Sequence, residues 1–179
     1  TDLARDIETG FLTRLALTPL HGAALLSGLL AGSVVLGLIQ AVAYLTVGLV
    51  AGAELAAGPA GVPVIVALSV TITVAFGTIG LFAALRFGSG EAVQGLFPVF
   101  FVFLFLSSMA LPLDLLEVDW FHAIASANPI SYLLQAFRSL LIEGWNLGEL
   151  ALGFGIALAI LAVGIVAASA ALKTRLVRT

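Results

Sequence analysis

Side chains capable of chemistry gather at only one place in this sequence, the segment 114–122. Asp114, Glu117 and Asp119 precede His122 there, so three carboxylates and one imidazole lie within a short stretch. Such groups can act as an acid–base pair or bind a divalent cation. No further carboxylate or histidine stands at ligand spacing, and we interpret the segment as a solvated acidic loop. We therefore expect no metal site.

Other catalytic arrangements are missing from the sequence. The chain has no Cys, which excludes disulfides, thiolate catalysis and Cys-based metal sites. His21 and His122 stand alone, so no serine in an apolar run has a base beside it. The phosphate-binding pattern G-x-x-x-x-G-K-[ST] does not occur. We expect no catalytic residues and no cofactor.

Composition places the chain in the membrane. Hydrophobic residues make up 61% of it, charged residues 9%, and the mean hydropathy is +1.21. A soluble domain carries roughly a quarter charged residues. The net charge of −3 and the absence of a Lys/Arg cluster argue against a nucleic-acid partner. The sequence predicts an integral membrane protein.

Four runs lack Asp, Glu, Lys and Arg, and each exceeds the roughly 20 residues that cross a bilayer. They are Leu15–Ala53, Leu55–Leu85, Ala92–Leu113 and Leu150–Leu172. We predict an all-α polytopic fold with four transmembrane helices at about 21–53, 63–86, 92–113 and 149–172. No Asp, Glu, Lys, Arg or His falls inside the predicted spans apart from their end residues, which argues against a proton-coupled carrier, an acidic-ring cation channel and a voltage sensor.

The distribution of basic residues predicts the orientation. With four spans both termini share one face, and six of the seven basic residues lie on it: Arg5, Arg14, Arg86, Lys173, Arg175 and Arg178. Arg138 is the only basic residue on the other face. We expect both termini of the chain in the cytoplasm.

The residues before the first span, 1–20, form a separate amphipathic segment. In a helix over 3–17, Leu3, Ile7, Phe11 and Leu15 share one row, while Arg5, Asp6, Thr9 and Thr13 lie mostly opposite. Such a helix rests on a surface, and both the bilayer interface and a docking protein fit the pattern.

The third span and the segment after it have unusual sequences. Phenylalanines crowd the span, Pro98 predicts a kink, and Ser107 and Ser108 stand near its end. In the outer segment 114–148, Trp120 and Trp145 are typical of an interfacial aromatic belt. Asn128 can cap a helix that has Pro129 in its first turn, and Gly144 can end it. We predict a short helix in the outer leaflet, re-entrant or interfacial.

Two motifs resemble the membrane subunit of type-2 ATP-binding-cassette exporters, the permease family that includes daunorubicin-resistance-type drug exporters. One is Glu8-Thr9-Gly10-Phe11-Leu12-Thr13-Arg14-Leu15 followed by Thr18-Pro19-Leu20. The other is Asn128-Pro129-Ile130-Ser131-Tyr132 followed by Ala136-Phe137-Arg138. Family members usually have six spans with the first motif between the second and third. The resemblance therefore implies that this chain, which begins at Thr1, lacks two N-terminal spans.

The resemblance also implies roles for residues. The segment 6–16 would be a coupling helix held by a separate ABC ATP-binding subunit, with Glu8, Gly10, Phe11 and Arg14 as the contacts. Phe97, Phe101 and Ser108 would line the substrate path. Asn128, Pro129, Tyr132 and Arg138 would belong to the re-entrant motif.

The implied protein is a permease, active as a homodimer or heterodimer in the prokaryotic inner membrane. It would export a drug, lipid or glycoconjugate. Two alternatives stay open at this point. One is a membrane scaffold that binds a cytoplasmic partner without transport, and the other is an intramembrane enzyme, for which no nucleophile and base can be paired.

Overall fold

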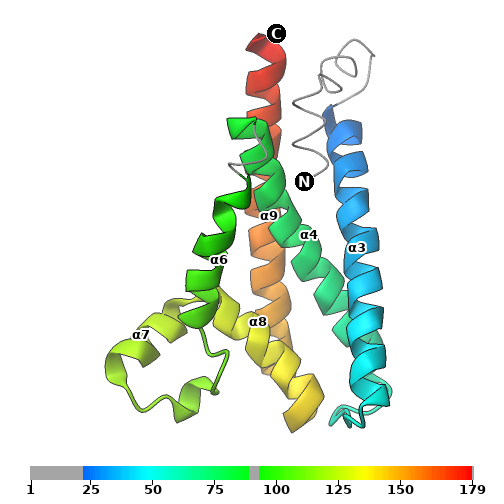
Figure 1. Cartoon of the computed structure of the whole chain (residues 1–179), viewed down its shortest axis with the longest axis vertical. Helices are drawn as coiled ribbons and strands as arrows, with labels where there is room; N and C mark the ends of the chain where they lie inside the picture. Colours follow the sequence, from blue (N-terminus) through cyan, green and yellow to red (C-terminus); the bar gives the residue numbers. More distant parts are fainter. Residues whose placement is uncertain (1–21, 89–92, 179) are drawn as a thin grey trace.

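The computed structural model describes residues 22–88 and 93–178, and all regular structure within them is helical. Three long helices run along the long axis of the molecule: α3 (Gly22–Val50), α4 (Gly61–Phe87) and α9 (Leu147–Arg178). Figure 1 shows the start of α3 and the C-terminus of α9 at the same end. The all-α prediction is confirmed.

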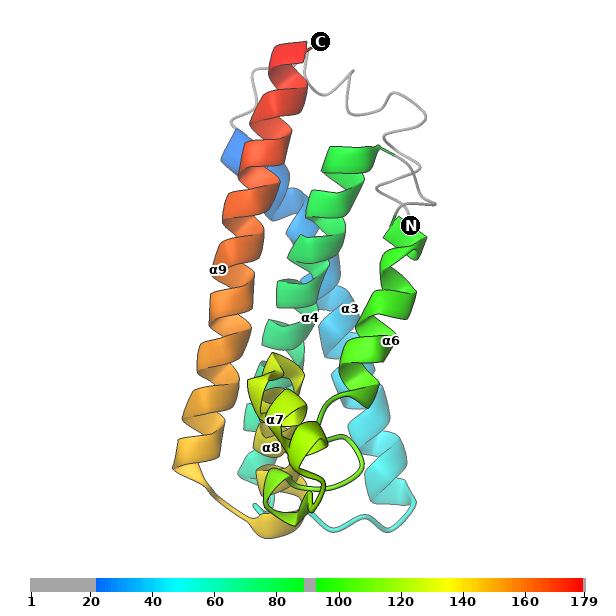
Figure 2. The same ribbon diagram turned by 90° about the vertical axis from the view of Figure 1, so that its left-hand side faces the viewer.

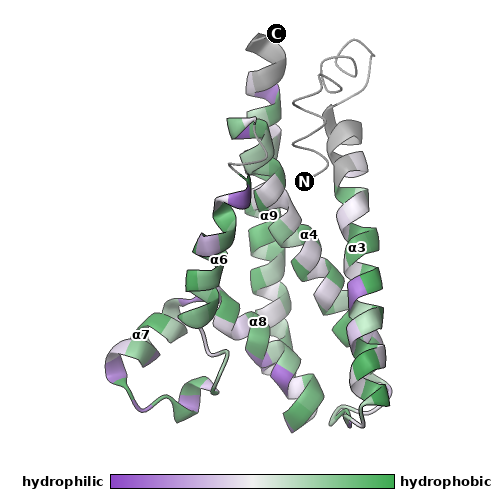
Figure 3. Ribbon diagram, in the orientation of Figure 1, coloured by the Kyte–Doolittle hydropathy of each residue, from purple (hydrophilic) through white to green (hydrophobic). Residues whose placement is uncertain are grey.

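Within the described residues, three segments are long and apolar enough to cross a membrane. They are Leu30–Val50 with 21 residues, Gly61–Phe87 with 27 and Leu147–Thr174 with 28. Figure 3 shows that hydrophobic residues dominate all three helices. Many of their large side chains point outward, as Val35, Ile39 and Val163 do. An apolar exterior of this kind suits a lipid environment, so the chain is a polytopic helical membrane protein.

The helix found within the predicted third span, 92–113, is shorter than the span. Helix α6 (Leu96–Phe105) has 10 residues, and turns lead from it to the short helix η1 (Leu113–Leu115). At 1.5 Å per residue, α6 is about 15 Å long, half of a hydrocarbon core. The helix ends because local and distant groups bind its last carbonyls. The Ser107 hydroxyl donates to the Leu104 carbonyl, and the Asn128 amide nitrogen donates to the carbonyls of Phe103 and Leu106.

Short helices follow α6 and lie at the end of the molecule opposite the C-terminus (Figures 1 and 2). They are α7 (Asp119–Ala127), α8 (Pro129–Arg138) and η2 (Ser139–Glu143), the last a single π-helical turn. We call α7 and α8 the outer hairpin, after the outer segment 114–148 that the sequence predicts. The predicted cap is confirmed, since the Asn128 side chain accepts the Ile130 N–H and α8 begins at Pro129. Gly144, with φ +104°, directly follows η2.

Helix α4 lies between α3 and α9, and small residues bring the three helices close together. A Cβ atom at Gly77 would lie 2.8 Å from the Ser33 hydroxyl of α3. A Cβ at Gly164 of α9 would overlap the Thr78 side chain of α4. These glycines permit backbone approaches that a larger residue would prevent, as in other membrane helix pairs. The close approach positions α9 so that its first turns support the outer hairpin.

Candidate functional site

Asn128 joins the C-terminal end of α6 to the N-terminal end of α8. Its amide nitrogen donates to the Phe103 carbonyl at 2.6 Å and to the Leu106 carbonyl at 3.1 Å. Its amide oxygen accepts the Ile130 N–H at 3.0 Å. The side chain is 5% exposed. Because both ends of the amide are used in a buried setting, Asn128 fixes the angle at which the outer hairpin leaves α6.

Ser108 and Ser131 make the second connection between the same two helices. The Ser108 N–H donates to the Ser131 hydroxyl at 3.0 Å, and the Ser108 hydroxyl donates to the Ser131 carbonyl at 3.3 Å. Arg138, the last residue of α8, donates from Nη2 to the Ser108 carbonyl at 2.8 Å. Both serines are completely buried. The polar face of α8 is thus turned toward the end of α6 and carries three hydrogen bonds to Ser108.

Tyr132 connects α8 to α7. Its hydroxyl donates to the Ser126 carbonyl at 2.7 Å, near the last turn of α7. Pro129 occupies the first turn of α8, where backbone N–H groups make no intrahelical hydrogen bond, so a proline costs none there. We refer to Ser108, Asn128, Ser131, Tyr132 and Arg138 together as the hairpin latch. Four of these five residues come from the Asn-Pro motif.

The outer hairpin also packs against α9 and the α3–α4 loop. Ala136 touches α9 so closely that a Cβ at Gly153 would overlap it. Leu140 and Leu150 are buried in the same apolar cluster as Ala57 of the α3–α4 loop. The Trp145 indole donates to the Ala57 carbonyl at 3.0 Å, so this side chain joins the segment after η2 to the α3–α4 loop. The latch therefore links α6, through α8, to α9 and the α3–α4 loop.

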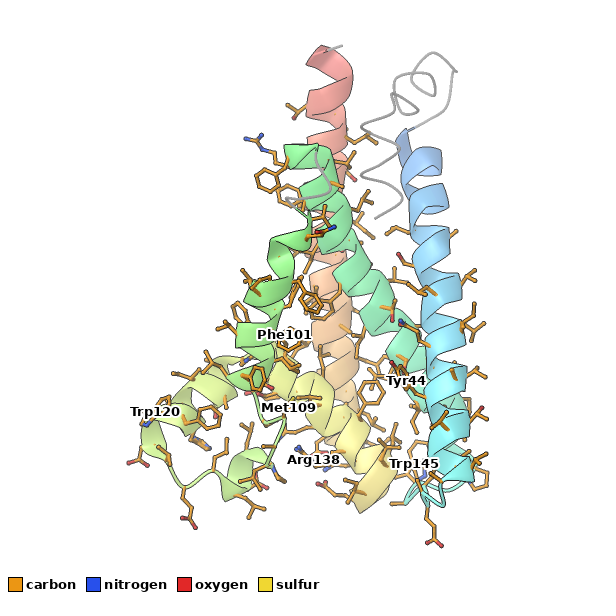
Figure 4. All side chains as sticks on the ribbon, in the orientation of Figure 1. Tyr44, Phe101, Met109, Trp120, Arg138 and Trp145 are labelled. Carbon is orange, nitrogen blue, oxygen red and sulfur yellow. The ribbon has the colours of Figure 1, made fainter. Side chains whose placement is uncertain are left out.

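The exposed side of α6 carries a row of aromatic rings. Phe97, Phe101 and Phe105 are 65%, 43% and 60% exposed, and their ring centroids are 4.9 Å and 5.9 Å apart. Figure 4 labels Phe101 on α6 above Met109. Phe100, which lies to the other side, meets Phe76 of α4 edge to face. The row is uncharged and able to hold apolar surface.

Two apolar hollows flank the outer hairpin. A cleft of about 520 Å³ lies between α3 and α4 and reaches Phe137 and Leu141; Tyr44, labelled in Figure 4, lines it. A smaller hollow of about 280 Å³ separates α6 from α4 and α8, with Phe76, Phe100 and Phe137 in its walls. Beside this hollow, α6 meets α4 through Phe100 and Phe76, and the latch holds the C-terminal end of α6.

The structure brings some of the sequence candidates together and separates others. Ser108, Asn128, Tyr132 and Arg138 meet in the latch, with Pro129 at the start of α8. Phe97 and Phe101 lie apart from it on the exposed face of α6, so buried Ser108 does not share a surface with them. The expected coupling residues Glu8, Gly10, Phe11 and Arg14 lie outside the described residues, as does His21.

The acidic residues form no site in the part of the chain that is described. Asp114, Glu117, Asp119 and His122 are all exposed, and within residues 22–88 and 93–178 no group of three potential metal ligands occurs. Sequence reasoning missed the role of Ser131 as a partner of Ser108. It also missed the second role of Asn128, for which one signal was available: an N-cap uses only the oxygen of this side chain, so its amide nitrogen still needs an acceptor.

Comparison with known families decides the class of the protein. The family model of the ABC-2 type transporters matches residues 2–142. The chain belongs to the ABC-2 type transporter family. No curated relative and no solved structure matches it. The match to the ABC-2 type transporters includes both sequence motifs, α3, α4, α6 and the outer hairpin.

Membership of the ABC-2 family assigns a coarse function. The chain is a multi-pass membrane component, or permease, of an ABC transporter. It is not the ATP-binding subunit, and a permease of this family associates with one. The hairpin latch is therefore part of the membrane-embedded machinery of a transporter.

Proposed function

We propose that this ABC-2 chain is the permease subunit of an ATP-driven exporter that moves an amphipathic or hydrophobic substrate outward. The substrate classes that fit are drugs, lipids and glycoconjugates. The observation that carries the proposal is the exposed, uncharged row of Phe97, Phe101 and Phe105 on a short helix held at one end by the hairpin latch. Aromatic walls without charges bind apolar surface and leave a charged head group in water.

The path would run along the exposed face of α6. Phe97 and Phe101 contact the substrate in this proposal, and Ser108 fixes the end of their helix against α8. A second permease copy, identical or homologous, would face the same row and complete the path.

Coupling to ATP hydrolysis would occur through the segment 6–16. Glu8, Gly10, Phe11 and Arg14 would contact the ABC ATP-binding subunit in the cytoplasm. The excess of basic residues on one face supports this orientation in a prokaryotic inner membrane. ATP-driven movement of the partner would then tilt α3 and the helices packed against it.

Reconstitution tests the proposal. The chain, its ABC ATP-binding subunit and any second permease chain are placed in inside-out vesicles, and ATP-dependent accumulation of a fluorescent amphipathic dye or short-chain lipid is measured. We expect accumulation in the vesicle lumen, reduced at least fivefold in Phe97→Ala/Phe101→Ala.

The matched control is Phe87→Ala at the end of α4, a phenylalanine that is 61% exposed and lies outside the proposed path. This variant should transport like the original chain. Efflux from the lumen instead of accumulation would contradict the direction of transport. Equal rates for both sets of variants would contradict the path.

A further inference from the structure

The cleft of about 520 Å³ between α3 and α4 is bounded at both of its ends. Near the middle of α3 the two helices touch, since a Cβ atom at Gly37 would lie 2.9 Å from the Thr73 Cβ. At the other end Ala53 of the α3–α4 loop lines the cleft, and backbone hydrogen bonds join this loop to η2. Gln40 and Tyr44 line the cleft and are exposed, and Figure 4 labels Tyr44. An occupant therefore enters from the side, past these two residues.

The walls of the cleft are apolar. Among the described residues that line it, none carries a charge. The hydroxyls of Ser69 and Thr73 in the α4 wall donate to carbonyls of their own helix, those of Ile65 and Ser69, at 2.8 Å. Phe137 and Leu141 form the wall on the side of the outer hairpin. The walls thus offer apolar contact and few partners for water, so they suit a hydrocarbon.

The dimensions of the cleft fit one hydrocarbon chain. Its lining extends from Gly37 to Leu49 on α3, about 18 Å at 1.5 Å per residue. One leaflet contributes about 15 Å, half of the hydrocarbon core. Over the length of the cleft, its volume corresponds to a cross-section of about 30 Å². A helix with its side chains is about 10–12 Å in diameter and needs roughly 80 Å² or more. The cleft therefore admits an acyl chain and excludes a helix of a second copy.

The charges near the loop end of the cleft favour an amine over an anion. Glu54 lies in the α3–α4 loop between two residues that line the cleft, and its side chain is exposed. Glu143 of η2 is also exposed. Arg138 is the only basic residue described at this end of the molecule, and it donates to the Ser108 carbonyl. Carboxylates repel an anionic head group and attract the ammonium of phosphatidylethanolamine.

We propose that the α3–α4 cleft binds one acyl chain of a phosphatidylethanolamine molecule from the leaflet on the side of the outer hairpin. The head group lies beside Glu54, and the chain passes Tyr44 and ends near Gly37. In this position the lipid fills the space between α3 and Phe137, so it connects α3 to the outer hairpin. The site is separate from the aromatic row of α6, and binding there does not depend on the proposed export.

Photolabelling in vesicles tests the inference. The full chain is placed in vesicles of equal amounts of phosphatidylethanolamine and phosphatidylglycerol, without nucleotide. A small part of the phosphatidylethanolamine carries a diazirine in one acyl chain, and the labelled peptides are mapped by mass spectrometry after irradiation. We expect at least threefold more label on residues 65–73 of α4 than on residues 163–166 of α9. Val163 and Val166 are both 70% exposed and lie outside the cleft, so they report ordinary contact with lipid.

Gly48→Leu should reduce the label on residues 65–73 at least fivefold. Gly48 lines the cleft, and a Cβ atom there would meet no atom closer than the Ala53 Cβ at 3.9 Å. The leucine therefore fits the fold and occupies the space of the acyl chain. Gly32→Leu is the same change on the same helix, outside the cleft and with no atom within 4 Å of its Cβ, and should keep the label. Equal labelling of the two variants, or no excess over residues 163–166 in the original chain, would overturn the inference.

Glu54→Lys tests the choice of head group. In the original chain the phosphatidylethanolamine probe should label residues 65–73 at least threefold more than a phosphatidylglycerol probe. Glu54→Lys should remove this preference, and Glu117→Lys, at an exposed site away from the cleft, should retain it. Equal labelling by both probes in the original chain would overturn the choice of lipid. Because labelling needs neither ATP nor a partner subunit, absent export with intact labelling would refute the proposed function alone.

Discussion

The Asn128 amide nitrogen lies 2.6 Å from the Phe103 carbonyl, across 25 positions of sequence, and this contact determines where α6 ends. The same side chain starts α8 through its oxygen. A single amide thus terminates one helix and initiates another. Because the two functions use different atoms, substitution can separate them.

Asn128→Ser should separate these functions. A serine still caps α8, but it has no amide to reach the carbonyls of Phe103 and Leu106. Two buried acceptors lose their donor, so we expect a loss of about 1–3 kcal/mol in unfolding free energy. Hydrogen exchange should rise at the end of α6 and stay low inside α8. Exchange that rises equally in both helices would show that the capping bond, not the link to α6, was lost.

Tyr132→Phe should loosen α7 from α8. The variant removes only the hydroxyl that donates to the Ser126 carbonyl, and one such bond contributes about 1 kcal/mol. Thermal unfolding in detergent measures the loss. Tyr44→Phe is the control, because the Tyr44 side chain is 77% exposed and makes no hydrogen bond within the described residues. Equal midpoints for the two variants would remove Tyr132 from the latch.

Gly164→Ala should destabilise the α4–α9 pair. The new methyl would overlap the buried Thr78 side chain, and the Thr78 backbone behind it is also close. Overpacking of this kind costs about 1–3 kcal/mol. Gly155→Ala on the same helix has no atom within 4 Å of its Cβ and should be neutral or slightly stabilising. Should both variants unfold at the same midpoint, the close approach of α9 to Thr78 is not a determinant of stability.

Simultaneous charge reversal at Glu8 and Arg14 should uncouple the transporter. If both residues contact the ABC ATP-binding subunit, the double variant should insert into the membrane normally but lose substrate-stimulated ATP hydrolysis at least fivefold. Asp119→Lys, a charge reversal at an exposed site of the outer hairpin, should leave the stimulation intact. Full stimulation in the double variant would exclude these two residues from coupling.

Much of the architecture follows from local sequence. Long charge-free runs predict helices that cross the bilayer, because a buried charge and an unpaired backbone are both costly there. The Asn128-Pro129 pair predicts the start of α8, since capping depends on atoms two residues apart. Three of the four predicted crossing segments correspond to helices of sufficient length. The motif spacing also led to the correct family.

The end of α6 within the third apolar run could not be predicted in the same way, because apolar composition does not indicate where a donor that is distant in the sequence will bind. The carbonyls of Phe103, Leu106 and Ser108 are taken by side chains 22 to 30 positions away, and only the folded chain brings these groups together. The sequence alone therefore determined the membrane class, the family and the capped start of α8. Tertiary packing decided the length of α6, the inward turn of the polar face of α8 and the meeting of Arg138 with Ser108, because each depends on contacts between helices.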